Sequence, residues 1–154
     1  MSPAKPMQAG WTGSDGFSGS KIALICAGEI LVYLRDDISS IPFPGHWDLP
    51  GGGREGDESP ETCALRELDE EFALRLPESR IVWSKAYPPE RAAGLWSWFF
   101  VAALSASEIA KIRFGDEGQR WEMWPIAVFL EHDLAVPHLK SRLTDYLAAS
   151  DRLG

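Results

Sequence analysis

The segment from Gly52 to Leu74, GGREGDESPETCALRELDEEFAL, constrains the fold of this chain more than any other stretch. Its second half predicts a helix, because Ser59 can cap the N-terminus, Pro60 suits the first helical position and no further Gly or Pro follows before Pro77. A helical projection gathers four apolar residues on one face, namely Ala64, Leu65, Leu68 and Phe72. We therefore expect an amphipathic helix that packs against a sheet.

Three glutamates, Glu67, Glu70 and Glu71, lie on a neighbouring face of the same helix. Like charges at these spacings repel one another by roughly 0.2–0.5 kcal/mol per exposed pair. A bound divalent cation would turn that repulsion into coordination, because Mg²⁺ and Mn²⁺ prefer carboxylate oxygens. Arg66 could hold one of the carboxylates through a bidentate contact. The alternative is a solvated acidic face, which composition alone favours.

A glycine run, Gly51 to Gly53, precedes the helix and follows the short apolar stretch 46–50. Glycine allows positive φ and lets the backbone approach a ligand closely. A metal cluster beside an exposed loop backbone is suited to bind a diphosphate. The presence of this loop makes a metal site a better explanation of the three glutamates than a solvated acidic face.

The residues of this segment resemble the Nudix box, G-x5-E-x7-R-E-U-x-E-E-x-G-U, in which U is a bulky aliphatic residue. The matching positions are Gly52, Glu58, Arg66, Glu67, Leu68, Glu70, Glu71 and Leu74. Ala73 stands where the pattern has glycine, which affects the turn at the helix end and leaves the carboxylates in place. The box covers about a seventh of the chain, and weaker resemblance extends on both sides of it.

The resemblance implies a pyrophosphohydrolase that cleaves the diphosphate linkage of a nucleoside di- or triphosphate or a nucleoside diphosphate-linked compound, with Mg²⁺ or Mn²⁺ as cofactor. The metal ligands that it implies are the carboxylates of Glu67, Glu70 and Glu71 and the backbone carbonyl of Gly51. Glu67 is also the candidate general base in some members of the family. Glu58 and Arg66 are expected to brace the helix carboxylates and the loop, and they complete the catalytic set of Glu58, Arg66, Glu67 and Glu70.

Further site candidates lie outside the box. Glu117, in the tripeptide Glu117-Gly118-Gln119 shortly before Trp121, resembles the distant loop glutamate that completes the metal site in mutator-type 8-oxo-dGTP diphosphatases. The asparagine that contacts the oxidised purine in that subfamily is absent, and His138 lies nearby in sequence. The nucleobase of the substrate is therefore not assigned. Substrate binding is expected from the backbone of Gly52 and Gly53. Arg35 is either a further substrate ligand or a solvated cation at a strand end.

Composition limits the classes of function. The chain has 154 residues and a formal net charge of −8, so no nucleic-acid-binding surface is evident. No apolar run approaches the ~20 residues of a membrane span, and no secretory signal is visible. Cys26 and Cys63 have no metal-ligand spacing and are expected to be buried, reduced thiols, which favours a cytoplasmic location.

The remaining elements predict one domain, residues 21–154, after an irregular lead-in, residues 1–20, in which Trp11 and Phe17 are apolar exceptions. Strands are expected at 21–27, 30–34, 80–87, 95–103 and 121–126. Helices are expected as a turn from residue 105, at 127–131 and at 137–149. These elements predict an α/β fold with a mixed central sheet between helical layers, and the Nudix-like α/β/α sandwich is also what the resemblance implies.

Two other functional hypotheses stay open beside the hydrolase. One is a non-catalytic nucleotide-binding module that retains the Nudix fold, and Ala73 is the feature in its favour. The other is a structural acidic domain that acts through protein partners, which leaves the glycine run unexplained. The expected partner is a small-molecule nucleotide or nucleoside diphosphate-linked substrate. Many members of the family dimerise, so a homodimer is also left open.

Overall fold

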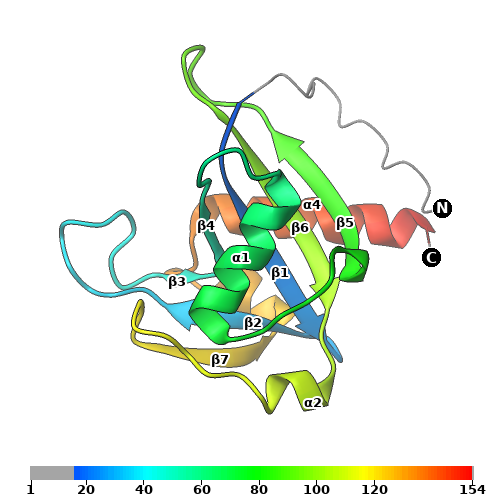
Figure 1. Ribbon diagram of the computed structural model, residues 1–154. Coiled ribbons are helices and arrows are strands. Elements are labelled where there is room, and N and C mark those ends of the chain that lie inside the picture. Colours follow the sequence, from blue (N-terminus) through cyan, green and yellow to red (C-terminus); the bar gives the residue numbers. More distant parts are fainter. Residues whose placement is uncertain (1–15, 154) are drawn as a thin grey trace.

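The computed structural model describes residues 16–153, which fold into one sheet with helices on both faces (Figure 1). The strands are β1 (Phe17–Cys26), β2 (Glu29–Leu34), β3 (Trp47–Asp48), β4 (Gly51–Gly53), β5 (Ile81–Tyr87), β6 (Trp96–Ala103) and β7 (Arg120–Pro125). The helices are α1 (Pro60–Phe72), the 3-10 turn η1 (Glu78–Arg80), α2 (Ala106–Ile109), α3 (Ile126–Glu131) and α4 (Pro137–Leu153).

The sheet is mixed, as predicted. Its main path runs β3-β2-β1-β6-β5, while β4 pairs with β1 and β7 pairs with β2. β1 and β6 are parallel, and the other pairings are antiparallel, including the predicted hairpin of β1 and β2. The central strand β1 therefore has β4 and β6 as neighbours on its two edges, which places the glycine strand close to the middle of the sheet.

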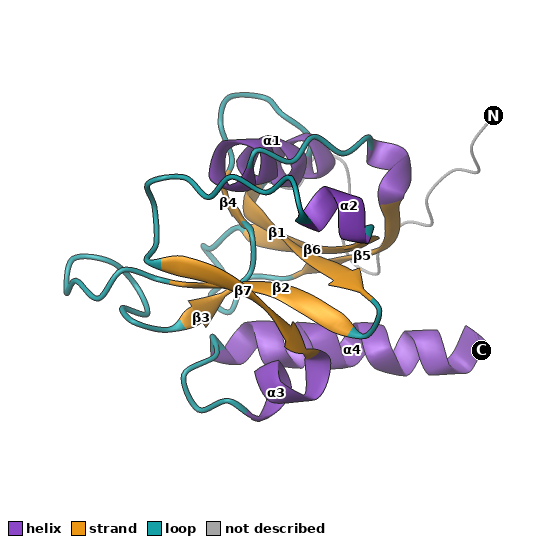
Figure 2. Cartoon of the chain, turned by 90° about the horizontal axis from the view of Figure 1, so that it is seen from below, coloured by secondary structure: helices purple, strands orange, loops and turns teal. Residues whose placement is uncertain are grey.

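Two apolar cores lie on the two faces of this sheet. Figure 2 shows α1 and α2 on one face and α3 and α4 on the other. Alternation along β6 supplies both cores: Trp98 and Phe100 pack on the α1 side, and Phe99 and Val101 pack on the α4 side. The predicted α/β/α sandwich is confirmed.

Helix α1 begins where its capping residues predict. The Ser59 hydroxyl accepts a hydrogen bond from the Thr62 backbone N–H, and Pro60 occupies the first turn. The helix ends at Phe72, and Ala73 adopts the left-handed conformation (φ 54°, ψ 33°) while its N–H donates to the carbonyl of Asp69. The turn for which the Nudix box supplies glycine is thus made by alanine, at a cost of roughly 1–2 kcal/mol.

The glycine run differs from its prediction. Gly51 to Gly53 was expected as a loop, but it is the strand β4, which pairs with residues 19–21 of β1. For the same reason β1 begins at Phe17, so residues 17–20 of the predicted lead-in belong to a strand. Apart from Phe17, neither segment has the β-branched or aromatic residues that mark a strand, and the pairing itself imposes the extended conformation. Phe17 packs into the core, while Trp11 lies outside the described residues.

The C-terminal half follows its prediction more closely. The predicted turn from Ser105 is α2, with a complete capping box, and the last helix runs to Leu153 rather than to Ala149. Both cysteines are free, as predicted, although Cys63 is buried and Cys26 is partly exposed. Among residues 16–153, no helix has the length and apolar character needed to cross a membrane.

Candidate active site

An acidic cavity of about 440 Å³ lies between the C-terminal half of α1, the strand β4 and the loop that precedes β7. Its wall contains four of the predicted glutamates together with the backbone of β4. The lining residues are Tyr33, Gly51, Gly52, Gly53, Glu55, Glu67, Glu70, Glu71, Gly115, Asp116 and Glu117. The structure therefore brings Glu117 to the box carboxylates across more than forty residues of sequence.

Glu71 is the most deeply placed of these carboxylates, with only 8% of its surface exposed. One oxygen, Oε1, accepts a hydrogen bond of 2.9 Å from the backbone N–H of Gly51. Burial raises the pKa of Glu71 to about 8, even though the Gly51 N–H and the charge of Lys21 act in the opposite direction. No ion pair to Glu71 forms within the described part of the chain, so no protein cation stabilises the ionised form of this carboxyl group.

Glu67 lies directly against β4, and this contact explains why Gly52 is glycine. A Cβ atom built on Gly52 would lie 2.6 Å from the Glu67 carboxyl carbon, which no side chain could accommodate without displacing the carboxylate. Burial raises the pKa of Glu67, and the charges of Glu70 and Glu117 add to that increase, while Arg66 opposes it. The carboxylates thus interact through space at one end of the cavity.

Glu70 and the 115–117 loop form the outer part of the cavity. The Glu70 side chain is 55% exposed and accepts a 3.1 Å contact from Arg66 Nη1. The loop is fastened to the end of α1, because the Gly115 N–H donates to the Glu71 carbonyl at 2.9 Å. That hydrogen bond holds Glu117 beside the helix carboxylates.

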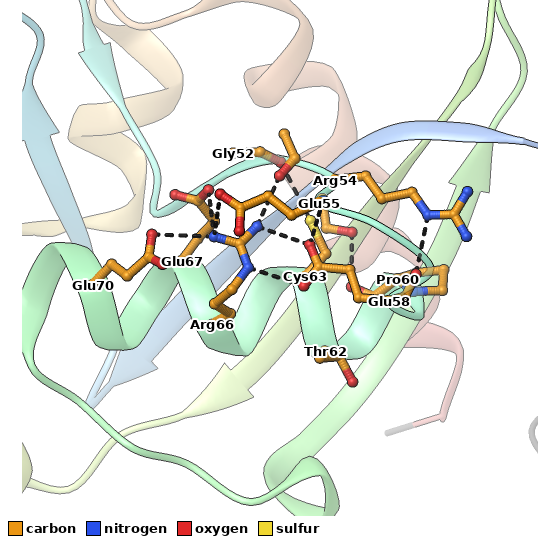
Figure 3. Close-up of polar contacts among 12 residues, drawn as sticks. Gly52, Arg54, Glu55, Glu58, Pro60, Thr62, Cys63, Arg66, Glu67 and Glu70 are labelled. Carbon is orange, nitrogen blue, oxygen red and sulfur yellow. Dashed lines mark hydrogen bonds and ion pairs between the residues drawn. The ribbon is translucent and has the colours of Figure 1, made fainter.

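Arg66 braces this arrangement from behind the cavity. Its Nε and Nη2 donate to both oxygens of Glu58 at 2.9 and 2.8 Å, and Nη1 reaches Glu67 at 3.0 Å (Figure 3). Nη2 also donates to the Gly53 carbonyl at 2.9 Å, which ties α1 to β4. The hydrogen bonds from Arg66 lower the pKa of Glu58 to about 2. Arg66 and Glu58 are thus placed to orient the carboxylates rather than to line the cavity.

The donor set of the cavity fits a hard divalent cation, because it consists of carboxylate and carbonyl oxygens, and Arg66, whose guanidinium lies nearby, pairs with only two of the four predicted glutamates. The type of donor atom suits the cation, but the side chains are not yet arranged around a single point. Within residues 16–153, no three His, Cys, Asp or Glu side chains already stand in an arrangement that could hold a metal ion. Arg66 contacts Glu67 and Glu70, so these side chains would have to turn toward the cavity to share an ion.

A second group of charges, not predicted from the sequence, lies beside the cavity. The Asp48 carboxylate is buried and accepts from Lys21 Nζ at 3.0 Å, Arg35 Nη1 at 2.8 Å and Tyr33 Oη at 3.0 Å. Its other oxygen accepts from the Leu49 N–H at 2.7 Å. Burial by itself would raise the pKa of Asp48, but these partners lower it. We call Lys21, Tyr33, Arg35 and Asp48 the ion cluster.

Arg35, a predicted substrate ligand, belongs to this ion cluster. Its guanidinium bonds Asp48 and, through Nε, the Pro42 carbonyl at 2.9 Å, and it does not line the acidic cavity. One signal in the sequence pointed to the ion cluster: Asp48 is a carboxylate inside an apolar run, a position that requires a buried partner. The other members stand at the start and end of strands, where the sequence alone does not show which of them meet.

Comparison with known proteins agrees with this geometry. The family model of the NUDIX domain matches residues 21–144. An RNA pyrophosphohydrolase of Acidiphilium cryptum is 34% identical over 99 residues, which are 56% of this chain and 59% of that protein. Diphosphoinositol polyphosphate phosphohydrolase 3-alpha of Mus musculus is 33% identical over 75 residues, 46% of this chain and 43% of that protein. The chain thus spans about three fifths or less of the length of these relatives.

The solved structure of the NUDIX domain of Shewanella oneidensis NrtR, in complex with ADP ribose, is similar over the whole fold. It superimposes with a TM-score of 0.60 at 26% identity and covers 95% of this chain and 96% of its own. The sheet between two helical layers is therefore shared along nearly the entire described chain. Because the family model spans most of the sequence, this chain belongs to the NUDIX domain family.

Proposed function

We propose that this chain is a divalent-cation-dependent pyrophosphohydrolase that cleaves the diphosphate linkage of a nucleoside di- or triphosphate or of a nucleoside diphosphate-linked compound. The observation that carries the proposal is the acidic cavity, in which Glu71 is buried and has no protein cation to stabilise its ionised form. A side chain in that state destabilises the fold unless a cation compensates it. The names of the relatives, one a pyrophosphohydrolase and the other a phosphohydrolase, support the same reaction.

The residues of the cavity divide into three roles. Those that would hold Mg²⁺ or Mn²⁺ are Glu67, Glu70, Glu71, Glu117 and the carbonyl of Gly51. When bound there, a divalent cation supplies positive charge to the diphosphate oxygens and makes a water molecule more acidic. Glu67, whose raised pKa suits a group that takes up a proton, accepts the proton of the attacking water. Glu58 and Arg66 keep that carboxylate in position.

The backbone of β4 provides the approach for the substrate. Gly52 and Gly53 present no side chain to the cavity, so a diphosphate can lie against the strand beside the carboxylates. Water attacks one phosphorus atom, the anhydride P–O bond breaks, and two phosphate-bearing products leave. The names of the relatives and of the similar solved structure mention different substrates and ligands. The proposal therefore names only the diphosphate linkage that is cleaved and leaves the rest of the substrate open. A homodimer and a cytoplasmic location stay predictions.

The test is a screen of the purified chain against nucleoside triphosphates, nucleotide sugars, ADP-ribose, dinucleoside polyphosphates, diphosphoinositols and 5′-triphosphorylated RNA. We expect phosphate or pyrophosphate release with Mg²⁺ or Mn²⁺ and none in EDTA. The non-catalytic binding module predicts tight nucleotide binding without metal-stimulated hydrolysis. No turnover across the panel with either metal would overturn the hydrolase proposal.

A further inference from the structure

A second cavity, of about 380 Å³, lies on the far side of β4 from the carboxylates. Gly52 and Gly53 line both cavities. Gly53 and Ser97 are the partners of Gly19 on the two edges of β1, so their backbones stand two strand spacings apart, about 10 Å. A substrate whose diphosphate lies at β4 would therefore extend toward Ser97 and the helix α4.

The side chain of Arg142, from α4, lines this second cavity and is held in place by two contacts. Its Nη2 donates to Ser97 Oγ at 2.9 Å, and its guanidinium carbon lies 4.3 Å from the centre of the Tyr87 ring. The ring is fixed in turn, because the Tyr87 hydroxyl donates to Asp145 at 2.7 Å. Arg142 is thus oriented before any ligand arrives.

The charge of Arg142 lacks a direct counter-ion. No carboxylate of residues 16–151 forms an ion pair with it, whereas the other cation of the cavity, Lys21, is paired with Asp48 at 3.0 Å. Burial lowers the pKa of Arg142, even though Tyr87, Glu90 and Asp145 act against the decrease. His138, the remaining basic residue of this wall, has its pKa lowered by burial and by Arg142. A partly buried guanidinium without a paired anion is unfavourable by itself.

We propose that Arg142 binds a phosphate group of the substrate other than the hydrolysed diphosphate. The guanidinium fork matches phosphate geometry, and Ser97 takes only one of its N–H groups, which leaves the others for a ligand. An outer cavity of about 360 Å³ shares Ser97, His138 and Arg142 with the inner one, so an extended substrate has room beyond Arg142. This inference rests on the proposed function for the identity of the ligand as a substrate.

The first test measures phosphate binding alone, which does not depend on hydrolysis. Inorganic phosphate is titrated into the metal-free chain in EDTA and followed by calorimetry. Without a cation the acidic cavity repels phosphate, so binding reports on the second cavity. We expect Arg142→Gln to weaken phosphate binding at least about tenfold, as expected for the loss of one charge-assisted hydrogen bond. Lys140→Gln is the matched control, because Lys140 lies on the same helix, bonds the His132 carbonyl and lines neither cavity.

Two milder variants distinguish a role of Arg142 in phosphate binding from a role in folding. Arg142→Lys keeps the charge but loses the fork, and Ser97→Ala removes only the hydrogen bond that orients the guanidinium. We expect both to fold with unchanged circular dichroism and to weaken phosphate binding by a few fold. Equal phosphate binding by wild type, Arg142→Gln and Ser97→Ala would overturn the proposal, as would no phosphate binding by the wild type.

The second test identifies the source of the phosphate. ATP is compared with ATP that carries a 3′-phosphomonoester and with a 5′-triphosphorylated dinucleotide, whose extra phosphate is a diester. We expect one of the two phosphorylated substrates to have a KM about tenfold below that of ATP, with kcat unchanged, and Arg142→Gln to abolish that advantage. Equal KM values for all three substrates would overturn the inference and leave the hydrolase intact. Conversely, no turnover of any substrate of the earlier panel with either metal, together with Arg142-dependent phosphate binding, would overturn the hydrolase and leave the phosphate site.

Discussion

Two buried carboxylates stand a short distance apart in this fold, and their surroundings are opposite. Asp48 is 2% exposed and receives hydrogen bonds from two cations and a tyrosine, and its pKa is lowered. Glu71 is 8% exposed and receives one backbone N–H, and its pKa is raised to about 8. Burial is nearly the same at the two sites, so the difference lies in the protein cations that contact each carboxylate.

This difference separates a structural charge from a functional one. The ion cluster around Asp48 is complete and joins the middle of β1 to the ends of β2 and β3. The acidic cavity around Glu71 is incomplete, since further carboxylates surround Glu71 where cations would lower its energy. On the proposed function, a buried carboxyl group whose ionised form the fold does not stabilise is the expected state of a cation site in the absence of the cation.

The largest expected effect is on turnover. Glu71→Gln and Glu70→Gln each keep the size and helix propensity of the side chain and remove the charge that would hold the cation. We expect each change to lower kcat by about a hundredfold or more while circular dichroism stays the same. Steady-state kinetics with the substrate found in the screen measures this.

Asp69→Asn is the control for the turnover experiment. Asp69 lies beside Glu70 in sequence, but its carboxylate pairs with the exposed Arg75 at 3.3 Å and does not line the acidic cavity. We expect its turnover to equal that of the wild type. Equal losses at positions 69 and 71, or no loss at either, would show that this face of α1 carries no metal chemistry.

The second-largest expected effect is on the free energy of unfolding and concerns Asp48. Asp48→Asn leaves Lys21 and Arg35 without their shared buried anion, and we expect the free energy of unfolding to fall by about 3–5 kcal/mol. Glu71→Gln, measured without metal, should keep or raise the stability, because it relieves repulsion. Urea denaturation in EDTA measures both. A loss at Glu71 as large as that at Asp48 would remove the distinction between them.

The pH dependence of stability is the third expectation. Because burial raises the pKa of Glu71 from 4.5 to about 8, the native state binds an additional proton between these values. The metal-free chain should therefore lose stability as the pH rises through that interval. In Glu71→Gln the decrease should be shallower. Melting temperatures in EDTA between about pH 5 and about pH 8 test this, and parallel curves for the two proteins would contradict the raised pKa.

The smallest expected effect concerns the end of α1 and involves no charge. Ala73 has φ 54°, a conformation that glycine adopts without strain. Ala73→Gly should raise the free energy of unfolding by about 0.5–1 kcal/mol. Ala64→Gly, in the buried middle of the helix, should lower it. If Ala73→Gly destabilises the chain, the left-handed turn at the helix end is wrong.

The parts of the fold that depend on neighbours in sequence were predictable. Ser59 and Pro60 predicted the start of α1, alternating residues follow the two faces of β6, and the resemblance of a loop tripeptide to the mutator-type diphosphatases predicted that Glu117 lies at the site. These signals are local, because capping, alternation and motif spacing are each read within a short window.

The parts that were missed depend on which segments meet. The strand character of β4 arises from its pairing with β1, and the ion cluster joins side chains from three strands. The burial of Arg142 depends on the packing of α4 against β6 and Tyr87. A window of sequence contains no information on such pairings, so the sequence left Arg35 as a substrate ligand or a solvated strand-end cation and did not predict its pairing with Asp48.

The most direct measurement is the melting temperature of the metal-free chain titrated with Mg²⁺ or Mn²⁺, for the wild type, Glu71→Gln and Asp69→Asn. A cation that binds only the native state stabilises it by about 2.7 kcal/mol at a hundredfold excess over Kd. If the unbalanced charge at Glu71 is a cation site, the melting temperatures of the wild type and Asp69→Asn rise with the metal concentration, and that of Glu71→Gln does not. An equal rise of the melting temperature in all three proteins, or no rise in the wild type, would contradict a cation site at Glu71.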